Sequence, residues 1–502
     1  VGPGEKALIV VRARDSRRGV QARGKQATHY ANSRCHYTRT TGIWQTVWLE
    51  AVPPVHLQRP RITADVAGSA FDVVVPLSAN RPGWAVRAIL CDDAGEIIRA
   101  EVRADLDIAP RLVLPISADR VRLWSTVDPH LYGLRLELVD AEGAVVDGAD
   151  SYAGLRSVSI DGQSVLINGK RVFQRLVLDQ GYWPDTLMTA PSDDALRTDI
   201  ELAIAAGFNG ARLHQKVFEE RYLYHADRLG YLVWGEFGDW GASVSGGDRE
   251  NNQQPTASFV AQWLEALGRD YNHPAIIGWC PLNETHQLLH DRITQLDDVT
   301  RAMFLAAKAL DTTRPVLDAS GYSHRVPETD IWDAHNYEQD PEQFLRQMRG
   351  LADGTPYGNT AAESGRPFSQ PYRGQPYFCS EFGGIWWNPD AAADAAGDDD
   401  AESWGYGQRV GDEEDFYARF TGLVDVLLDN PLMFGYCYTQ LTDVFQEQNG
   451  IYRSDRTTKF DIARIKKIQI RPAAYENLSD DLPNISPPED GSTTVPARRT
   501  LS

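Results

Sequence analysis

Short apolar runs alternate with amphipathic segments along the chain from residue 155 onward. The run at 275–282 is apolar throughout and lies between His273-Pro274 and a polar turn, which is typical of a strand buried on both faces. Eight such strands are expected, at 172–178, 207–213, 231–235, 275–282, 315–319, 331–335, 376–380 and 432–439. Helices are expected between most of them, beginning after Ser192 and at 218–229, 256–269, 293–310, 341–348 and 412–428. The alternation predicts a (β/α)8 TIM barrel over 155–471.

A different pattern precedes the barrel, because short strands recur there without helices. They are expected at 62–66, 71–75, 85–90, 112–114 and 134–139, with turns at 93–95 and 141–143. About 100 residues of this pattern, 53–154, predict an immunoglobulin-like β-sandwich.

The two ends of the chain fit neither pattern. Strands are expected at 7–13 and 42–50, but two or three strands do not make a stable sheet alone. Residues 1–52 therefore either pack on the rest of the chain or lack their partner strands. Residues 472–502 are rich in Pro, Ser, Asp and Thr without periodicity, and we expect them to be disordered.

Charge and composition exclude several classes of partner. The 502 residues carry a formal net charge of −20, which disfavours nucleic acid and anionic membranes as partners. No apolar run approaches the roughly 18–20 residues that span a bilayer. The five cysteines show no disulfide or zinc spacing and favour a reducing, cytoplasmic compartment. Whether the chain forms a homo-oligomer stays open.

Two of the expected strands carry a glutamate at their far end. Glu284 follows Asn283 after the fourth strand, and Glu381 follows the seventh. Catalytic groups of a parallel barrel lie at the carboxyl ends of its strands, so the two carboxyl groups are expected to face each other. Such a pair can divide the work of glycoside cleavage, one group protonating the leaving oxygen and the other attacking carbon or activating water. For either glutamate alone, a strand-end salt bridge is the alternative.

Other polar and aromatic side chains are expected around the same barrel mouth. Each also has a structural alternative, as a buried cation, a satisfied core histidine or a packing aromatic. The candidates are Arg212, His214, His335 and Tyr337 at strand ends, and Trp386 and Trp387, which could stack on a sugar, in the loop after Glu381.

Several motifs together resemble one known family. The segment Asn272–Trp279 leading into Asn283-Glu284 resembles the acid/base signature of glycoside hydrolase family 2, the family of β-galactosidases, β-glucuronidases and β-mannosidases. Segments 40–45, 123–132, 208–212 and 229–236 are similar to further parts of its jelly roll, immunoglobulin-like domain and barrel. The resemblance covers roughly residues 5–465 and implies that 1–52 are the last strands of a truncated sugar-binding jelly roll.

The resemblance also implies roles for individual residues. Glu284 would be the general acid/base and Glu381 the nucleophile of a retaining enzyme. Asn283 would bind the sugar 2-hydroxyl, while Arg212 and Tyr337 would hydrogen-bond the nucleophile.

Three departures from the family pattern change what is expected of the site. Tyr436, Tyr438 and Gln440 stand where the eighth strand of the family ends in a Trp, and Tyr438 becomes a candidate for the sugar floor. The Asn-x-Lys pair of glucuronidases is missing from 448–451, which disfavours that specificity. The Glu-x-His that helps to hold magnesium in large β-galactosidases is missing after Glu236, so we expect no essential metal and no other cofactor.

The sequence thus predicts a retaining exo-β-glycosidase, β-galactosidase-like, that takes an oligosaccharide or glycoside as substrate. Mannosidase, glucuronidase or arabinosidase specificity stays open, as do an inverting mechanism and a catalytically silent carbohydrate-binding protein.

Overall fold

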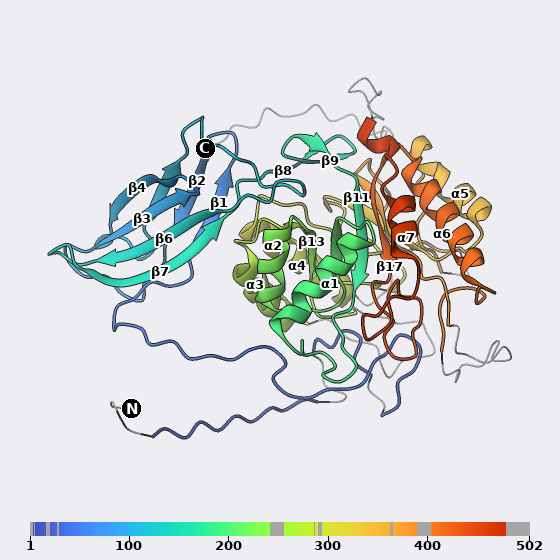
Figure 1. Cartoon of the computed structure of the whole chain (residues 1–502), viewed down its shortest axis with the longest axis horizontal. Coiled ribbons are helices and arrows are strands. Elements are labelled where there is room, and N and C mark those ends of the chain that lie inside the picture. The colour runs from blue at the N-terminus through green and yellow to red at the C-terminus, as the bar shows by residue number, and fades with distance from the viewer. Residues whose placement is uncertain are drawn as a thin grey trace.

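Two bodies make up the described part of the chain: a β-sandwich and a parallel barrel covered by helices (Figure 1). The structure is a computed structural model. It describes residues 4, 6–16, 21–27, 30–240, 256–285, 287–289, 294–361, 365–388 and 403–477. No described helix has the length and apolar character needed to cross a lipid bilayer.

The sandwich consists of two antiparallel sheets, one of three strands in the order β1-β2-β5 and one of four in the order β4-β3-β6-β7. Its strands are β1 (Arg61–Asp65), β2 (Ala70–Val74), β3 (Ala85–Asp92), β4 (Gly95–Arg103), β5 (Arg111–Pro115), β6 (Tyr132–Val139) and β7 (Val145–Ala153). The expected sandwich is confirmed. Its strands β4 and β7 escaped prediction because both carry charged, largely exposed side chains and bury few apolar positions.

The barrel sheet contains seven parallel strands in the order β14-β13-β12-β11-β17-β16-β15. They are β11 (Gln174–Asp179), β12 (Gly210–Leu213), β13 (Leu232–Glu236), β14 (Ile276–Cys280), β15 (Trp332–Asn336), β16 (Tyr377–Gly383) and β17 (Met433–Thr439). Each matches an expected strand, and most of their residues are buried, because helices cover the outside while side chains fill the inside.

The expected strand at 315–319 is not a regular strand. Only isolated parallel bridges, Trp279–Val316 and Asn283–Ser320, tie this segment to the end of β14. On its other side, the amide of Val316 donates to the Asp330 carboxylate at 2.8 Å instead of to a neighbouring strand. Side chains thus replace the ladder hydrogen bonds, which interrupts regular pairing at this point of the barrel.

Seven helices surround the described part of the sheet (Figure 1). They are α1 (Asp193–Ala205), α2 (Glu220–Leu229), α3 (Ala257–Asp270), α4 (Gln295–Leu310), α5 (Pro341–Met348), α6 (Glu413–Leu428) and α7 (Ile462–Gln469). The first six match the expected helices. The side chains of Ser192 and Asp412 cap α1 and α6 by accepting backbone N–H groups, which explains where these helices begin. Helix α7 was not predicted; it buries only Ile465 and Gln469.

Smaller elements join and close the two bodies. A three-stranded sheet, β8 (Val158–Asp161), β9 (Ser164–Ile167) and β10 (Lys170–Arg171), leads into the barrel. Two 3-10 helices, η1 (Arg349–Asp353) and η2 (Ala474–Asn477), complete the described elements. In η2 the buried hydroxyl of Tyr475 donates to the carbonyl of Val165 at 2.8 Å, so the packed chain continues beyond the expected boundary at 471. The rest of the segment expected to be disordered, 478–502, lies outside the described residues.

The strands expected near the start of the chain are not formed. Both segments run as extended, solvent-exposed chain, with Leu8 90% and Trp48 60% exposed. A strand needs a neighbour to satisfy its backbone groups, and no described strand lies beside either segment. The structure therefore does not show a jelly-roll remnant in the described residues before 53. Between the two segments, however, residues 24–27 and 34–37 dock on the barrel, where Tyr37 is fully buried.

The sandwich and the barrel are joined through a buried aspartate. The Asp227 carboxylate of α2 accepts a hydrogen bond from the Tyr152 hydroxyl at 2.8 Å and contacts Nδ1 of His273 at 2.6 Å. Its carbonyl accepts the indole N–H of Trp124 at 2.7 Å. These contacts attach the sandwich to α2 and to the segment that leads into β14.

Candidate active site

The carboxyl ends of three barrel strands each present a glutamate. Glu236 is the last residue of β13, Glu284 follows β14, and Glu381 lies near the end of β16. The strands are parallel, so their carboxyl ends meet at one rim, and the three side chains reach the same space. Sequence reasoning selected Glu284 and Glu381 and overlooked Glu236, although the signal of a glutamate ending an apolar strand was the same.

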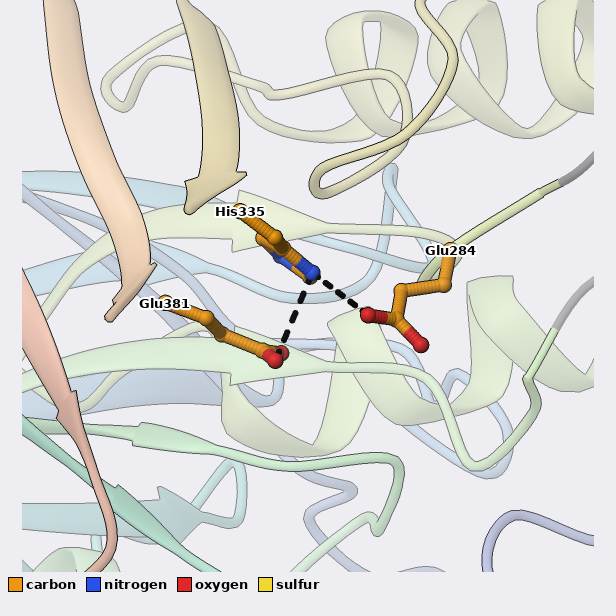
Figure 2. Close-up of side chains that lie close together, drawn as sticks. All are labelled: Glu284, His335 and Glu381. Atoms are coloured by element: carbon orange, nitrogen blue, oxygen red, sulfur yellow. Dashed lines mark hydrogen bonds and ion pairs between the residues drawn. The ribbon is translucent and has the colours of Figure 1, made fainter. Parts of the chain in front are cut away.

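The carboxyl groups of Glu284 and Glu381 lie close together on either side of His335 (Figure 2). One oxygen of each carboxyl group and one ring nitrogen of His335 all lie within 4.8 Å of one another. Retaining glycosidases hold their carboxyl groups about 5–5.5 Å apart, whereas inverting ones leave about 6.5–9.5 Å for a water molecule. The pair therefore has the spacing of a nucleophile and an acid/base that act on one carbon.

Glu284 is the more accessible of the two carboxyl groups. Its side chain is 11% exposed, against 4% for Glu381. Oε2 accepts the indole N–H of Trp240 at 2.9 Å, and Oε1 lies 2.7 Å from Nδ1 of His335. The backbone of Glu284 has φ of 43°, a left-handed conformation that is unusual for a residue other than glycine and is found preferentially at functional sites.

Glu381 is surrounded by groups that stabilise a negative charge. Its Oε1 forms an ion pair with Nη2 of Arg212 at 3.0 Å, and its Oε2 accepts a short hydrogen bond from the Tyr337 hydroxyl. Both groups donate to the carboxyl group and hold it in one orientation. An anionic, buried and rigidly held carboxylate is suited to nucleophilic attack.

Arg212 connects the strand ends to one another. Its fully buried guanidinium donates to Glu236 at 2.8 Å and to the amide oxygen of Asn283 at 2.7 Å, in addition to its contact with Glu381. Burial alone would lower the pKa of Arg212, but the charges of Glu236 and Glu381 outweigh burial and raise that pKa. Arg212 is thus a permanent cation that fixes the nucleophile candidate.

The amide of Asn283 retains an unused donor. Because its Oδ1 accepts from Arg212, its Nδ2 is oriented away from the guanidinium. That nitrogen is buried and has no hydrogen-bond partner among the described residues. A buried donor without a partner is costly unless a ligand satisfies it, so Nδ2 can bind a hydroxyl of a substrate.

His335 bridges the two glutamates. Its Nδ1 lies 2.7 Å from Glu284 and 3.3 Å from Glu381, while its Nε2 lies 2.9 Å from the hydroxyl of Ser320. Burial alone would lower the pKa of His335, but Glu381 and Glu284 outweigh burial and raise that pKa. The three side chains could also surround a metal ion, since one ligand atom of each lies within 4.8 Å of the others.

His214 and Tyr337 also lie where the sequence suggested. Nδ1 of His214 is 3.0 Å from Arg212 and 3.6 Å from Glu381, and burial, followed by the charges of Lys25 and Arg212, holds the pKa of His214 well below its usual value. His214 is therefore neutral. The ring of Tyr337 stacks on Tyr406 with a centroid separation of 3.4 Å, which keeps its hydroxyl directed at Glu381.

Three expected binding residues do not join this cluster. Tyr438 packs against Phe420 of α6 at a centroid distance of 5.1 Å, because alternation along β17 turns it to the helix layer. It belongs to the core and not to the sugar floor. Trp386 donates from its indole to Ser403 at 3.0 Å, and Trp387 packs partly against the core. The described structure gives none of the three a contact with either glutamate.

Two residues at the mouth were missed by sequence reasoning altogether. Trp240 contacts Glu284 directly, and Lys25 lies with its ammonium 5.0 Å from the centroid of the Trp240 ring. Neither residue ends an apolar strand. Only the folding of a distant segment over the barrel brings Lys25 here, and no local signal could have found it.

Comparison with known families supports both bodies of the fold. The family model described as "Glycosyl hydrolases family 2" matches residues 55–156. A second model, described as "Glycosyl hydrolases family 2, TIM barrel domain", matches residues 158–348. Both matches carry the name of the same family, and together they span the sandwich and more than half of the barrel.

Individual relatives have low identity and differ in their names. A β-glucuronidase of Paenibacillus borealis is 26% identical over 284 residues, which cover 55% of this chain and 45% of that protein. A β-galactosidase 2 of Enterobacter cloacae is 26% identical over 389 residues, covering 71% of this chain and 35% of that protein. The chain thus spans less than half the length of these two relatives. The solved β-D-glucuronidase of Dictyoglomus thermophilum superposes with a TM-score of 0.64 at 18% identity, over 84% of this chain and 70% of that one, which shows a shared fold.

Proposed function

Because the chain belongs to glycoside hydrolase family 2, a family of retaining enzymes, we propose that it hydrolyses terminal β-linked sugars through a covalent glycosyl-enzyme. The observation that carries the proposal is the close approach of the Glu284 and Glu381 carboxyl groups, whose oxygens lie within 4.8 Å. An inverting mechanism needs room for a water molecule between the two groups, and this spacing argues against it.

In the first step Glu381 attacks the anomeric carbon. A bond forms between its carboxylate oxygen and that carbon as the bond to the departing oxygen breaks. Glu284 gives its proton to the departing oxygen, so the aglycone leaves as a neutral alcohol. Arg212 and Tyr337 support the assignment of Glu381 as nucleophile, because they hold an ionised carboxylate in place.

In the second step water releases the sugar. Glu284, now ionised, takes a proton from water, and the resulting hydroxide attacks the anomeric carbon while the bond to Glu381 breaks. Two inversions at one carbon give overall retention. The greater exposure of Glu284 supports this role, because the acid/base must reach both the aglycone and incoming water.

Asn283 fits a supporting role in both steps. Its free Nδ2 lies on the residue next to Glu284 and can donate to the hydroxyl adjacent to the reacting carbon. Hydrogen bonds to that hydroxyl strengthen as the transition state develops.

We propose that the proton on His335 and Glu284 sets the pH above which activity is lost. The pKa of His335 is raised, so the proton that it shares with Glu284 stays bound to higher pH than on an ordinary histidine. This proton is present below the raised pKa and is lost above it. We expect His335→Asn to move the alkaline limb of the kcat/KM profile down by about one pH unit or more. The pH dependence of kcat/KM over pH 4–10 measures this, with His56→Asn on the sandwich as the control. An unchanged alkaline limb would show that His335 does not share the catalytic proton.

A β-galactosidase-like specificity is our proposal for the sugar. The β-galactosidase 2 relative and the lack of an Asn-x-Lys pair at 448–451 support it over a glucuronidase. We expect a panel of 4-nitrophenyl β-glycosides (galactoside, glucoside, mannoside, arabinoside and glucuronide) to give fastest hydrolysis for the galactoside. Proton NMR of the initial product should show the β-anomer.

The panel also separates the enzymatic proposal from the alternatives. Fastest hydrolysis of another sugar would assign another specificity within the family. An α-anomeric initial product would contradict retention. A cooperatively folded protein that hydrolyses no member would favour a carbohydrate-binding protein without catalysis.

A further inference from the structure

A buried lysine of the N-terminal segment has no acceptor for its ammonium. Lys25 is only 8% exposed, and no hydrogen bond or ion pair joins its Nζ to the described residues. Its Nζ lies over the faces of two rings, 5.0 Å from the centroid of Trp240 and 5.8 Å from that of Tyr37. Buried ammonium groups are normally hydrogen-bonded to acceptors, so three unused N–H donors at this place call for a ligand.

The segment around Lys25 is held firmly on the barrel mouth. Gly24 has φ of +59°, and a Cβ at this position would lie 2.4 Å from the carbonyl oxygen of Gln215, in the loop after β12. The hydroxyl of Tyr37 donates to the buried carboxylate of Glu447 at 2.5 Å. The Trp404 indole donates to the carbonyl of Arg34, also at 2.5 Å. These contacts fix the segment on both sides of Lys25.

Two aromatic rings connect the ammonium to carboxyl groups at the mouth. Trp240, over which Nζ lies, donates its indole N–H to Glu284 at 2.9 Å. Tyr37, the other ring, donates to Glu447. Lys25 is thus linked through Trp240 to the acid/base candidate and through Tyr37 to a further carboxylate, that of Glu447.

The charge of the ammonium is already balanced. Burial alone would lower the pKa of Lys25, but four neighbouring acidic groups together raise it, in the order Cys35, Glu447, Glu381 and Glu284. Burial raises the pKa of the Cys35 thiol to about 12, so this thiol is neutral near pH 7 and the carboxylates carry the effect. Lys25 therefore needs a hydrogen-bond acceptor more than a further negative charge.

We propose that Lys25 binds the sugar that is cleaved, donating a hydrogen bond to a hydroxyl of a neutral glycoside. This inference rests on the proposed function and deepens it, because it names the substrate class and assigns the N-terminal segment to the substrate site. A hydroxyl oxygen accepts from the ammonium without adding charge. The carboxylate of a uronic acid would instead enter a space that already holds Glu284, Glu381 and Glu447, whose charges repel it.

The first test removes the donor and keeps most of the volume. Lys25→Met should lower kcat/KM for the preferred neutral aryl β-glycoside by about 10- to 100-fold, the loss expected for one hydrogen bond to a charged group. Lys25→Arg should recover part of the activity, because it keeps charged N–H donors. Lys170→Met, at an exposed lysine of β10, is the matched control and should match the wild type.

The second test separates binding from a structural role. The wild type and Lys25→Met are each assayed on monodeoxy versions of the preferred substrate, each of which lacks one hydroxyl. For one deoxy substrate, kcat/KM of the wild type should be about 10- to 100-fold lower than for the parent substrate. For Lys25→Met the same change of substrate should lower kcat/KM little, because the contact is already absent. A purely structural defect would lower activity on the parent and on all deoxy substrates by the same factor.

Several outcomes overturn the inference while the retaining glycosidase activity that we propose still stands. These are a Lys25→Met variant with wild-type kcat/KM, equal losses across the deoxy series, and a wild type that prefers the glucuronide and loses that preference in Lys25→Met.

Absence of turnover by the wild type on every panel member would contradict the proposed function instead. Calorimetric titration with D-galactose, D-glucose, D-mannose, L-arabinose and D-glucuronate then decides the role of Lys25. Weaker binding of a neutral sugar to Lys25→Met supports the inference. Binding of none, or of D-glucuronate alone, overturns it.

Discussion

Glu381→Ala is expected to abolish turnover, with kcat at least about 10⁴-fold below the wild type. The carboxylate that forms the bond to the anomeric carbon is missing in this variant. Arg212 and Tyr337 contact Glu381 but offer only N–H and O–H donors. Hydrolysis of the preferred aryl β-glycoside measures the loss, and Glu328→Ala at an exposed ion pair is the control that should keep full activity.

Azide tests the same assignment in a second way. A small anion can enter the space left by the Glu381 side chain and attack the anomeric carbon from that side. A single displacement inverts the configuration, so the product should be the α-glycosyl azide. A β-glycosyl azide would mean that Glu284 is the nucleophile, and restored hydrolysis without a glycosyl azide would exclude nucleophilic catalysis by Glu381.

Glu284→Ala is expected to act differently on different leaving groups. A poor leaving group needs the proton that Glu284 provides, so kcat/KM for a 4-methoxyphenyl β-glycoside should fall about 10²- to 10⁴-fold. A 2,4-dinitrophenyl leaving group needs little protonation, and its kcat/KM should fall much less. Release of the glycosyl-enzyme then becomes slow, because Glu284 no longer activates water, and a burst of dinitrophenol should precede slow turnover.

Azide should also rescue this variant, with the opposite stereochemistry. It attacks the glycosyl-enzyme from the face where water normally enters, and two inversions give the β-glycosyl azide. Equal losses for both leaving groups would contradict the acid role of Glu284. Glu338→Gln, also near the mouth, is a control for altered charge at the rim.

Local patterns were sufficient for most of the elements. Seven of the eight expected barrel strands and the six expected helices form, because each depends on a periodicity that is visible within its own residues. The strand expected at 315–319 failed because Asp330 and other side chains take over its backbone hydrogen bonds. The segments at 7–13 and 42–50 failed because a strand pattern does not supply a neighbouring strand.

The same distinction applies to the site. Glu284 and Glu381 could be selected from the sequence, because the barrel topology brings the carboxyl ends of parallel strands to one rim whatever the details of packing. The sequence could not show that His335 bridges them, that Arg212 pairs with Glu236 as well as with Glu381, or that Tyr438 faces the helices.

The sequence by itself determined the class of fold and the two glutamates, since these follow from strand order and local periodicity. The resemblance to a known family, and not the periodicity, implied the division of roles that we propose for them. Only the tertiary structure decided the distance between the carboxyl groups and brought Trp240 and Lys25 to the mouth. The physical reason is that hydrogen bonds and charges act over a few ångströms in space, and the residues that supply them here lie in segments up to hundreds of positions apart. No local pattern records such contacts.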